Sequence, residues 1–395
     1  MEVVVNRRGF VQGMCYGGLA TLGAPLVSLA RVPGNGRFVF VLLRGGLDGL
    51  ATVVPIADPA YGSIRGRLAY DPDELLPIGE GFALAPGLAP LSELAARGEL
   101  VALQAMAIPY RTRSHFDGQA ILETGLDRPD GSSNGWLNRL LQVMEGTREG
   151  IAVAAGMPRS MSGSIGVATW SPASLGATSD AYIERLHVLY QRDPILLDRF
   201  EAALQLQEVA TEATAGMAGA GQGRRRGQMA PVMRATARFL REPDGPNVAA
   251  VEFGGWDTHT NQGLAGGSLD RLLAGLAEGI LAYEAESGSS WSDTTIVVMT
   301  EFGRTARPNG TGGTDHGTAG AGLVVGPGVA RGPVLTDWPG LSGRELYEGR
   351  DLRPTLDTRA VLKGVVMGVF DLTATQANRV FPGSTDVRPR TDLIR

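Results

Sequence analysis

The hydrophobic positions along the chain form a series of short, unbroken apolar runs, each bounded by glycine or polar residues. The first run, residues 37–43 (RFVFVLL), opens into the turn Arg44-Gly45-Gly46-Leu47-Asp48-Gly49. Four more runs follow, at 99–105, 247–253, 294–300 and 321–325. Apolar runs of this length without alternation are typical of strands buried on both faces, as in a parallel sheet. We predict a strand at each of them.

Longer segments with helical spacing of apolar residues lie between these runs. We predict helices at 88–97, 114–123, 134–144, 182–211, 229–241, 268–286 and 358–369. Alternating strands and helices predict an α/β fold with a mostly parallel sheet. Residues 212–228 (EATAGMAGAGQGRRRGQ) interrupt the alternation with small residues and three arginines, and we expect a flexible excursion there.

The first thirty residues read as a targeting segment. Arg7 and Arg8 precede Gly9-Phe10 and an apolar, glycine-rich stretch, and small residues lie near Ala30, where a peptidase could cut. This order is typical of a twin-arginine export signal, so we expect residues 1–30 to be removed and the protein to be periplasmic or secreted. Pro25 interrupts the apolar stretch, which is shorter than the roughly 20 residues of a spanning helix, so we expect no stable membrane span.

Composition narrows the function further. The 395 residues are 43% hydrophobic and carry a net charge of −5, which suits a globular domain over 31–395 and excludes a basic nucleic-acid footprint. The single cysteine, Cys15, lies in the targeting segment, so the chain offers neither an internal disulfide nor a cysteine-based zinc cluster. A metal would need carboxylate, imidazole or hydroxyl ligands.

Three of the four histidines lie beside carboxylates in polar or glycine-rich segments. These segments are SHFDG around His115, WDTHT around His259 and TDHG around His316. The fourth, His187, lies in a helical pattern (ERLHVLY), where a surface or packing role is expected.

Carboxylates also follow three of the predicted strands. Asp257 and His259 are two positions apart after 247–253, so both side chains leave an extended chain on the same side. Asp48 and Glu301 follow two further strands, and sites in open parallel sheets form beyond the carboxyl ends of strands. We predict a site for one or two divalent ions, zinc, calcium or magnesium, with these ligands: Asp48, Asp257, His259, Glu301 and His316. Asp48 or Glu301 taken alone fits a turn or cap carboxylate equally well.

Two arginines accompany these carboxylates. Arg44 lies four residues before Asp48, and Arg304 lies three residues after Glu301. Their guanidinium groups could hold a phosphate or sulfate in bidentate fashion, or each could pair with the neighbouring carboxylate.

These segments together resemble a known family. The motifs are Arg-Arg-Gly-Phe near the start, LRGGLDG at 43–49, SHF at 114–116, NGW at 134–136, GWDTH at 255–259, TEFGR at 300–304 and GTDHG at 313–317. They resemble the exported bacterial proteins grouped as domain of unknown function 1501, considered related to the alkaline phosphatase and sulfatase superfamily. The resemblance implies an alkaline-phosphatase-like three-layer sandwich, with the central sheet flanked by helices and a metal site at strand ends.

The resemblance also implies roles. Ser114 is the candidate nucleophile, although a serine before a helix also serves as its N-cap. His115 is a candidate ligand or general acid, and Asp315 is expected to orient His316 from behind. One departure stands out: Glu301-Phe302 replaces the superfamily's Asp-His pair, so that position supplies one ligand fewer.

The leading hypothesis is an exported metal-dependent hydrolase of phosphate or sulfate esters, acting on a small-molecule or carbohydrate ester. The alternative is a superfamily member without catalysis that binds a carbohydrate or a partner protein. A purely structural metal is a third reading. The sequence leaves the oligomeric state open.

Overall fold

The computed structural model describes residues 36–129, 134–144, 149–154, 156–171, 229–330 and 332–395, with scattered positions between 183 and 204. The predicted export signal at 1–30, the excursion at 212–228 and most of the helix predicted at 182–211 lie outside the described residues. None of the described helices combines the length and apolar character that crossing a bilayer requires.

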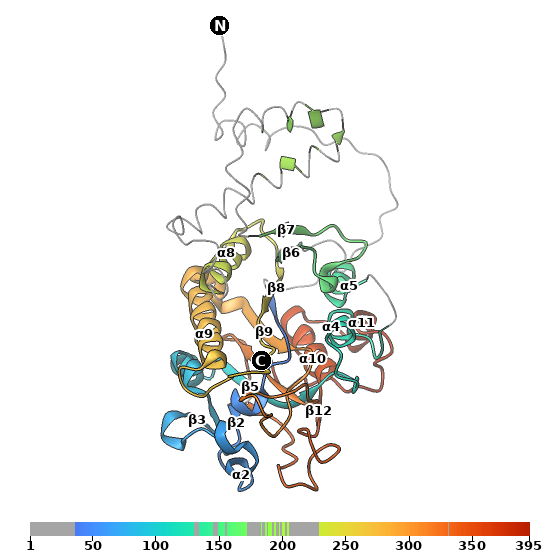
Figure 1. The fold of residues 1–395 in the computed structure, drawn as a ribbon. Coiled ribbons are helices and arrows are strands. Elements are labelled where there is room, and N and C mark those ends of the chain that lie inside the picture. Colours follow the sequence, from blue (N-terminus) through green and yellow to red (C-terminus); the bar gives the residue numbers. More distant parts are fainter. Residues whose placement is uncertain are drawn as a thin grey trace. The chain divides into compact units, whose positions relative to one another are not determined.

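A nine-stranded sheet forms the centre of the described fold (Figure 1). Its strands are β1 (Arg37–Arg44), β5 (Leu100–Ala107), β6 (Gly150–Val153), β7 (Ala168–Trp170), β8 (Val248–Gly254), β9 (Thr294–Thr300), β10 (Gly320–Val325), β11 (Val334–Leu335) and β12 (Leu356–Asp357). Their order is β11-β5-β10-β9-β1-β8-β6-β7, and β12 pairs with β5. Strand β10 runs antiparallel to both of its neighbours, and the other pairings are parallel.

Helices cover both faces of this sheet. Helices α8 (Met229–Arg241) and α9 (Ser268–Ser287) lie on one face, and α4 (His115–Thr124), α5 (Trp136–Val143), α10 (Thr358–Phe370) and α11 (Ala374–Val380) lie on the other (Figure 1). Successive β1 side chains alternate between the two cores, with Val39 on the α8–α9 side and Phe38 and Phe40 on the other. The predicted α/β fold, with a mostly parallel sheet flanked by helices, is confirmed.

All five predicted strands are present, and the smaller elements were missed. The missed elements include a second, antiparallel sheet of β2 (Val53–Val54), β4 (Phe82–Leu84) and β3 (Leu76–Gly79). The helix predicted at 88–97 is a 3₁₀ segment, η5 (Pro86–Leu91), followed by α3 (Ser92–Ala96). Within the described residues, the remaining short helices are α2 (Tyr61–Arg65), η2 (Gly49–Ala51), η3 (Gly66–Leu68), η4 (Pro72–Glu74), η6 (Arg159–Met161) and η8 (Gly288–Asp293).

The register of the central strands brings three loops to one edge of the sheet. Leu43 in β1 is level with Phe253 in β8 and with Thr300 in β9, so the chain leaves all three strands at the same height. Gly45 allows the close approach of two of these loops, because a Cβ there would lie 2.5 Å from the backbone nitrogen of Asp257. Its φ of +130° also favours glycine. The candidate site is built at this edge.

Candidate metal centre

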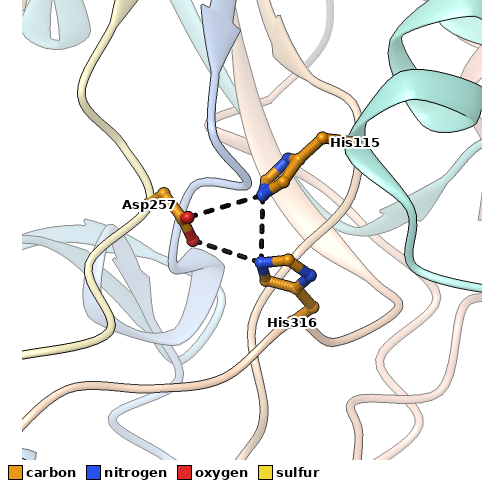
Figure 2. Close-up of side chains that lie close together, drawn as sticks. All are labelled: His115, Asp257 and His316. Carbon is orange, nitrogen blue, oxygen red and sulfur yellow. Dashed lines mark hydrogen bonds and ion pairs between the residues drawn. The ribbon is translucent and has the colours of Figure 1, made fainter.

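Three histidines and one aspartate come close together from three separate segments of the chain. His115 is the first residue of α4, Asp257 and His259 follow β8, and His316 lies between β9 and β10. Figure 2 shows His115, Asp257 and His316 pointing toward one another, and their ligand atoms all lie within 4.8 Å of one another. The structure therefore brings together four of the residues predicted for the site.

The shortest separations in the cluster join Nε2 atoms. The Nε2 atom of His316 is 2.9 Å from that of His115 and 3.0 Å from that of His259. Oδ1 of Asp257 is 3.0 Å from Nε2 of His259 and 3.3 Å from Nε2 of His316. Oδ2 of Asp257 is 3.6 Å from Nε2 of His115. The Nε2 atom of His316 is thus a close neighbour of the other two Nε2 atoms, and the Asp257 carboxylate lies beside all three rings.

The Nδ1 atom of each imidazole, on the opposite side of the ring from Nε2, makes a hydrogen bond that orients the ring. The Nδ1 partners are Oε1 of Glu301 for His115 (2.7 Å), Oδ1 of Asp315 for His259 (3.0 Å) and the carbonyl of Arg113 for His316 (3.0 Å). The carbonyl can only accept a hydrogen bond. The hydrogen bonds of Asp315 with Asn309 and His259 hold its pKa below the usual value, so this carboxylate is ionised and accepts as well.

Glu301 also stays ionised although it is fully buried. Burial works against the charge, but hydrogen bonds from His115 and Gln119 outweigh it and keep the pKa of Glu301 below its usual value. The backbone of Gly45 and the hydroxyl of Thr300 donate to the same carboxylate. Glu301, predicted as a ligand, therefore lies behind His115 and orients it.

This pattern leaves the facing Nε2 atoms without protons when the rings are neutral, because each ring proton is on Nδ1. Nitrogen lone pairs and a carboxylate repel one another at these short distances. A cation between them removes the repulsion. Three imidazoles with a carboxylate suit zinc, and a Zn–N length of about 2.0 Å in tetrahedral geometry separates ligand nitrogens by about 3.3 Å. The residues present therefore fit a divalent ion of this kind.

A proton is the cation that competes with a metal here. The hydrogen bond to Glu301 raises the pKa of His115, whereas burial and then the charge of His115 lower the pKa of His316. His115 consequently accepts a proton before His316 does.

Asp257 is fixed by a buried arginine. The NH1 group of Arg304 lies 2.5 Å from Oδ1 of Asp257, and the Arg304 side chain is fully buried. Burial opposes ionisation of Asp257, but the pairing with Arg304 brings its pKa below the usual value. Arg304 was predicted to hold an anion, and the structure places its guanidinium against Asp257 and against Thr314.

Arg44, the other predicted anion-binding residue, is already hydrogen-bonded to side chains of the protein. Its guanidinium donates to Gln119 (2.5 Å), Glu123 (3.1 Å) and Glu252. Its side chain is 28% exposed.

Asp48, predicted as a ligand, lies beside the centre in a buried ion pair. Its Oδ2 accepts from Arg65 at 2.6 Å and from Gln262 at 2.7 Å, and its Oδ1 accepts from the backbone of Ala51 at 3.3 Å. The Asp48 and Arg65 side chains are 1% and 0% exposed. The structure thus places an internal guanidinium against this carboxylate.

Ser114 caps helix α4, as one of its two predicted roles requires. Its Oγ accepts from the backbone of Asp117 at 3.5 Å, and its backbone is extended (φ −91°, ψ 126°). The cap fixes where α4 begins, and therefore where His115 lies.

Asp315 was expected to orient His316, and the structure places it against His259 instead. The contact that orients His316 is a main-chain carbonyl, that of Arg113, and no residue type signals it in the sequence. Arg65 and Gln262 were also missed, because neither lies in one of the motifs. Phe302 was noted only as a departure, yet its buried ring packs against the centre, with its centroid 4.8 Å from that of His115 and 5.2 Å from that of His316.

Two solved structures are similar to the chain at a distance. One is the C-terminal periplasmic domain of EcEptC from Escherichia coli in complex with Zn, at 12% identity over 74% of this chain and 74% of that chain, with a TM-score of 0.32. The other is the phosphonate monoester hydrolase of Agrobacterium radiobacter, at 11% identity over 76% and 70% of the two chains, also with a TM-score of 0.32. At such scores the likeness carries no conclusion about activity.

Comparison with curated proteins gives no match. A family model described as protein of unknown function (DUF1501) matches residues 99–381, which is well over half of the chain. The match includes all four residues that converge on the centre. The chain therefore belongs to the DUF1501 family.

Proposed function

We propose that this protein is an exported, zinc-dependent hydrolase that cleaves phosphate or sulfate esters of small molecules or carbohydrates. One observation carries the proposal: the Nε2 atom of His316 lies 2.9 Å from that of His115 and 3.0 Å from that of His259, beside an ionised aspartate. Further support comes from access, since the side chains of Asp257 and His259 are 42% and 40% exposed. A substrate can therefore reach the centre from solvent.

In this proposal His115, Asp257, His259 and His316 hold the ion. When bound, the ion would accept an ester oxygen as a fifth ligand, polarise the ester as a Lewis acid and offset the negative charge of the transition state. The hydrogen-bond partners on the far side of the rings keep each Nδ1 protonated, so that the ligand atom stays Nε2. Phe302 excludes water from the buried side.

Ser114 is proposed as the attacking hydroxyl because it precedes His115 directly. Arg44 and Arg304 already neutralise carboxylates inside the protein, so in this proposal they contribute less to anion binding than their positions in the sequence suggest. The ester's negative charge then faces the metal centre itself.

The test pairs two histidine variants. We expect wild-type protein to carry zinc and to hydrolyse 4-nitrophenyl phosphate or 4-nitrophenyl sulfate, and His259→Ala to lose both properties, with zinc affinity reduced at least about tenfold. His187→Ala is the matched control, since that ring contacts Glu201 in another part of the chain. Zinc content is measured by atomic emission and turnover by absorbance. Protein that takes up no zinc would sink the proposal.

The alternative reading, a binding protein without catalysis, is favoured by the same neutralised arginines and by the capping role of Ser114. Under this reading the protein holds zinc and turns over neither ester, while the zinc-loaded form binds a glycan or protein partner. If the wild type hydrolyses either ester and His259→Ala does not, the binding-protein alternative is rejected.

A further inference from the structure

Of the three imidazoles, only His316 is oriented by a main-chain atom. Its Nδ1 donates to the carbonyl of Arg113, whereas the other two rings donate to carboxylates. Arg113 has φ +63°, a left-handed conformation that residues with a side chain rarely adopt. Because this backbone conformation is unfavourable for arginine, other interactions of Arg113 must stabilise it and keep its carbonyl in position.

The Arg113 side chain is held by two carboxylates in different surroundings. Its Nε donates to Oδ2 of Asp351 at 2.8 Å, and its NH2 donates to Oε2 of Glu348 at 2.7 Å. Asp351 is fully buried, and the Glu348 side chain is 57% exposed. Water screens the Glu348 contact, so most of the hold on Arg113 comes from Asp351.

Asp351 also fixes the chain on the other side of His316. Its Oδ2 accepts from the hydroxyl of Thr318 at 2.7 Å, two residues beyond the histidine. Arg350 lies 3.2 Å from Oδ1 of Asp351 through NH1, and its NH2 donates to the backbone carbonyl of His316 at 2.9 Å. One buried carboxylate thus ties Arg113, whose carbonyl contacts this ring, to the chain that follows His316.

We infer that Asp351 is a positioning residue of the zinc centre: it sets the affinity for the ion through Arg113, whose carbonyl orients His316. The side-chain contacts of Asp351 are with Arg113, Thr318 and Arg350, and none of these residues is a proposed ligand. The inference rests on the proposed zinc centre.

The test measures Zn²⁺ affinity of the full-length protein by competition with a chromophoric chelator. We expect Asp351→Asn to weaken Zn²⁺ binding by about tenfold to a hundredfold. The matched control is Glu348→Gln, which removes a carboxylate from the same arginine at the exposed position, and we expect a loss under about threefold. The visible absorption of Co²⁺-loaded protein should change in Asp351→Asn and not in Glu348→Gln, because only the first variant releases His316.

A double-mutant cycle separates this role from general destabilisation. In an Arg113→Ala background, which should itself weaken Zn²⁺ binding about tenfold, Asp351→Asn should have little further effect. Wild-type affinity in folded Asp351→Asn would overturn the inference and leave the zinc centre standing. If Asp351→Asn does not fold, wild-type affinity in Arg113→Ala has the same consequence. A wild type that binds no Zn²⁺ removes both proposals.

Discussion

At the scale of single residues, Asp48 and Asp257 show how the same side chain takes different roles at neighbouring strand ends. Both are paired with a buried arginine, but the Asp257 side chain remains 42% exposed and faces the histidines. Asp48 is almost fully buried against Arg65. Both oxygens of Asp48 already accept hydrogen bonds inside the protein, and neither faces the histidines, so we expect one ion per chain.

The first prediction concerns Asp48. Asp48→Asn should leave the zinc content at one ion per chain and lower the free energy of unfolding by about 3–5 kcal/mol, because it leaves the buried charge of Arg65 unpaired. Denaturant unfolding and atomic emission on the same preparation check this. Replacing Arg65 by Met in the same variant should recover part of the lost stability. Folded Asp48→Asn without zinc would show that Asp48 is a ligand.

The residues of the centre could be predicted from the sequence when their side chains are of a type that binds metal ions. His115, His259, His316 and Asp257 lie in polar, glycine-rich segments at strand ends, and a metal site needs those residue types. The carbonyl of Arg113 could not be predicted, because every residue has a carbonyl and its use depends on backbone geometry. Asp351 could not be assigned either, because Arg113 and Thr318, the partners through which it acts, lie far from it in the sequence.

At the scale of elements, helix α4 connects sequence to site most directly. The Ser114 cap sets the first turn, and the first turn carries His115. A shift of α4 by one residue would turn this ring by about 100° away from the centre.

The second prediction separates the two roles of Ser114. Ser114→Ala should lower the free energy of unfolding by about 1 kcal/mol through loss of the cap, whereas Ser114→Asp should preserve it. If Ser114 is the nucleophile, neither variant hydrolyses esters, since neither has the hydroxyl. Thermal unfolding and an aryl ester assay on both variants check this. Wild-type turnover in Ser114→Asp would exclude the serine as the attacking group.

Long apolar runs made the central strands predictable, because only a doubly covered sheet buries five such segments. Strands such as β2, β11 and β12 have two residues each, too few for any periodicity. The antiparallel direction of β10 also escaped prediction. Its run at 321–325 has the same apolar character as the parallel strands, and direction depends on the path of the connecting chain.

At the scale of the whole molecule, the proposed site and the proposed export route both require that the chain fold before it crosses the membrane. A twin-arginine pathway carries folded proteins, and the centre exists only in a folded chain. The third prediction is that replacing Arg7 and Arg8 by Lys leaves folded, zinc-containing protein in the cytoplasm and removes it from the periplasm. Cell fractionation with immunodetection and zinc analysis checks this. Unchanged periplasmic protein would contradict the export proposal.

The separation of the histidines along the chain has a consequence for the order of events during synthesis. His115 and His316 are 201 positions apart, and the last of the proposed ligands leaves the ribosome after most of the sheet strands. No early fragment can present all three rings, so a partial chain offers the ion at most an incomplete set of ligands. A nascent chain would therefore retain the proposed metal ion only after His316 has been synthesised and the central strands have paired.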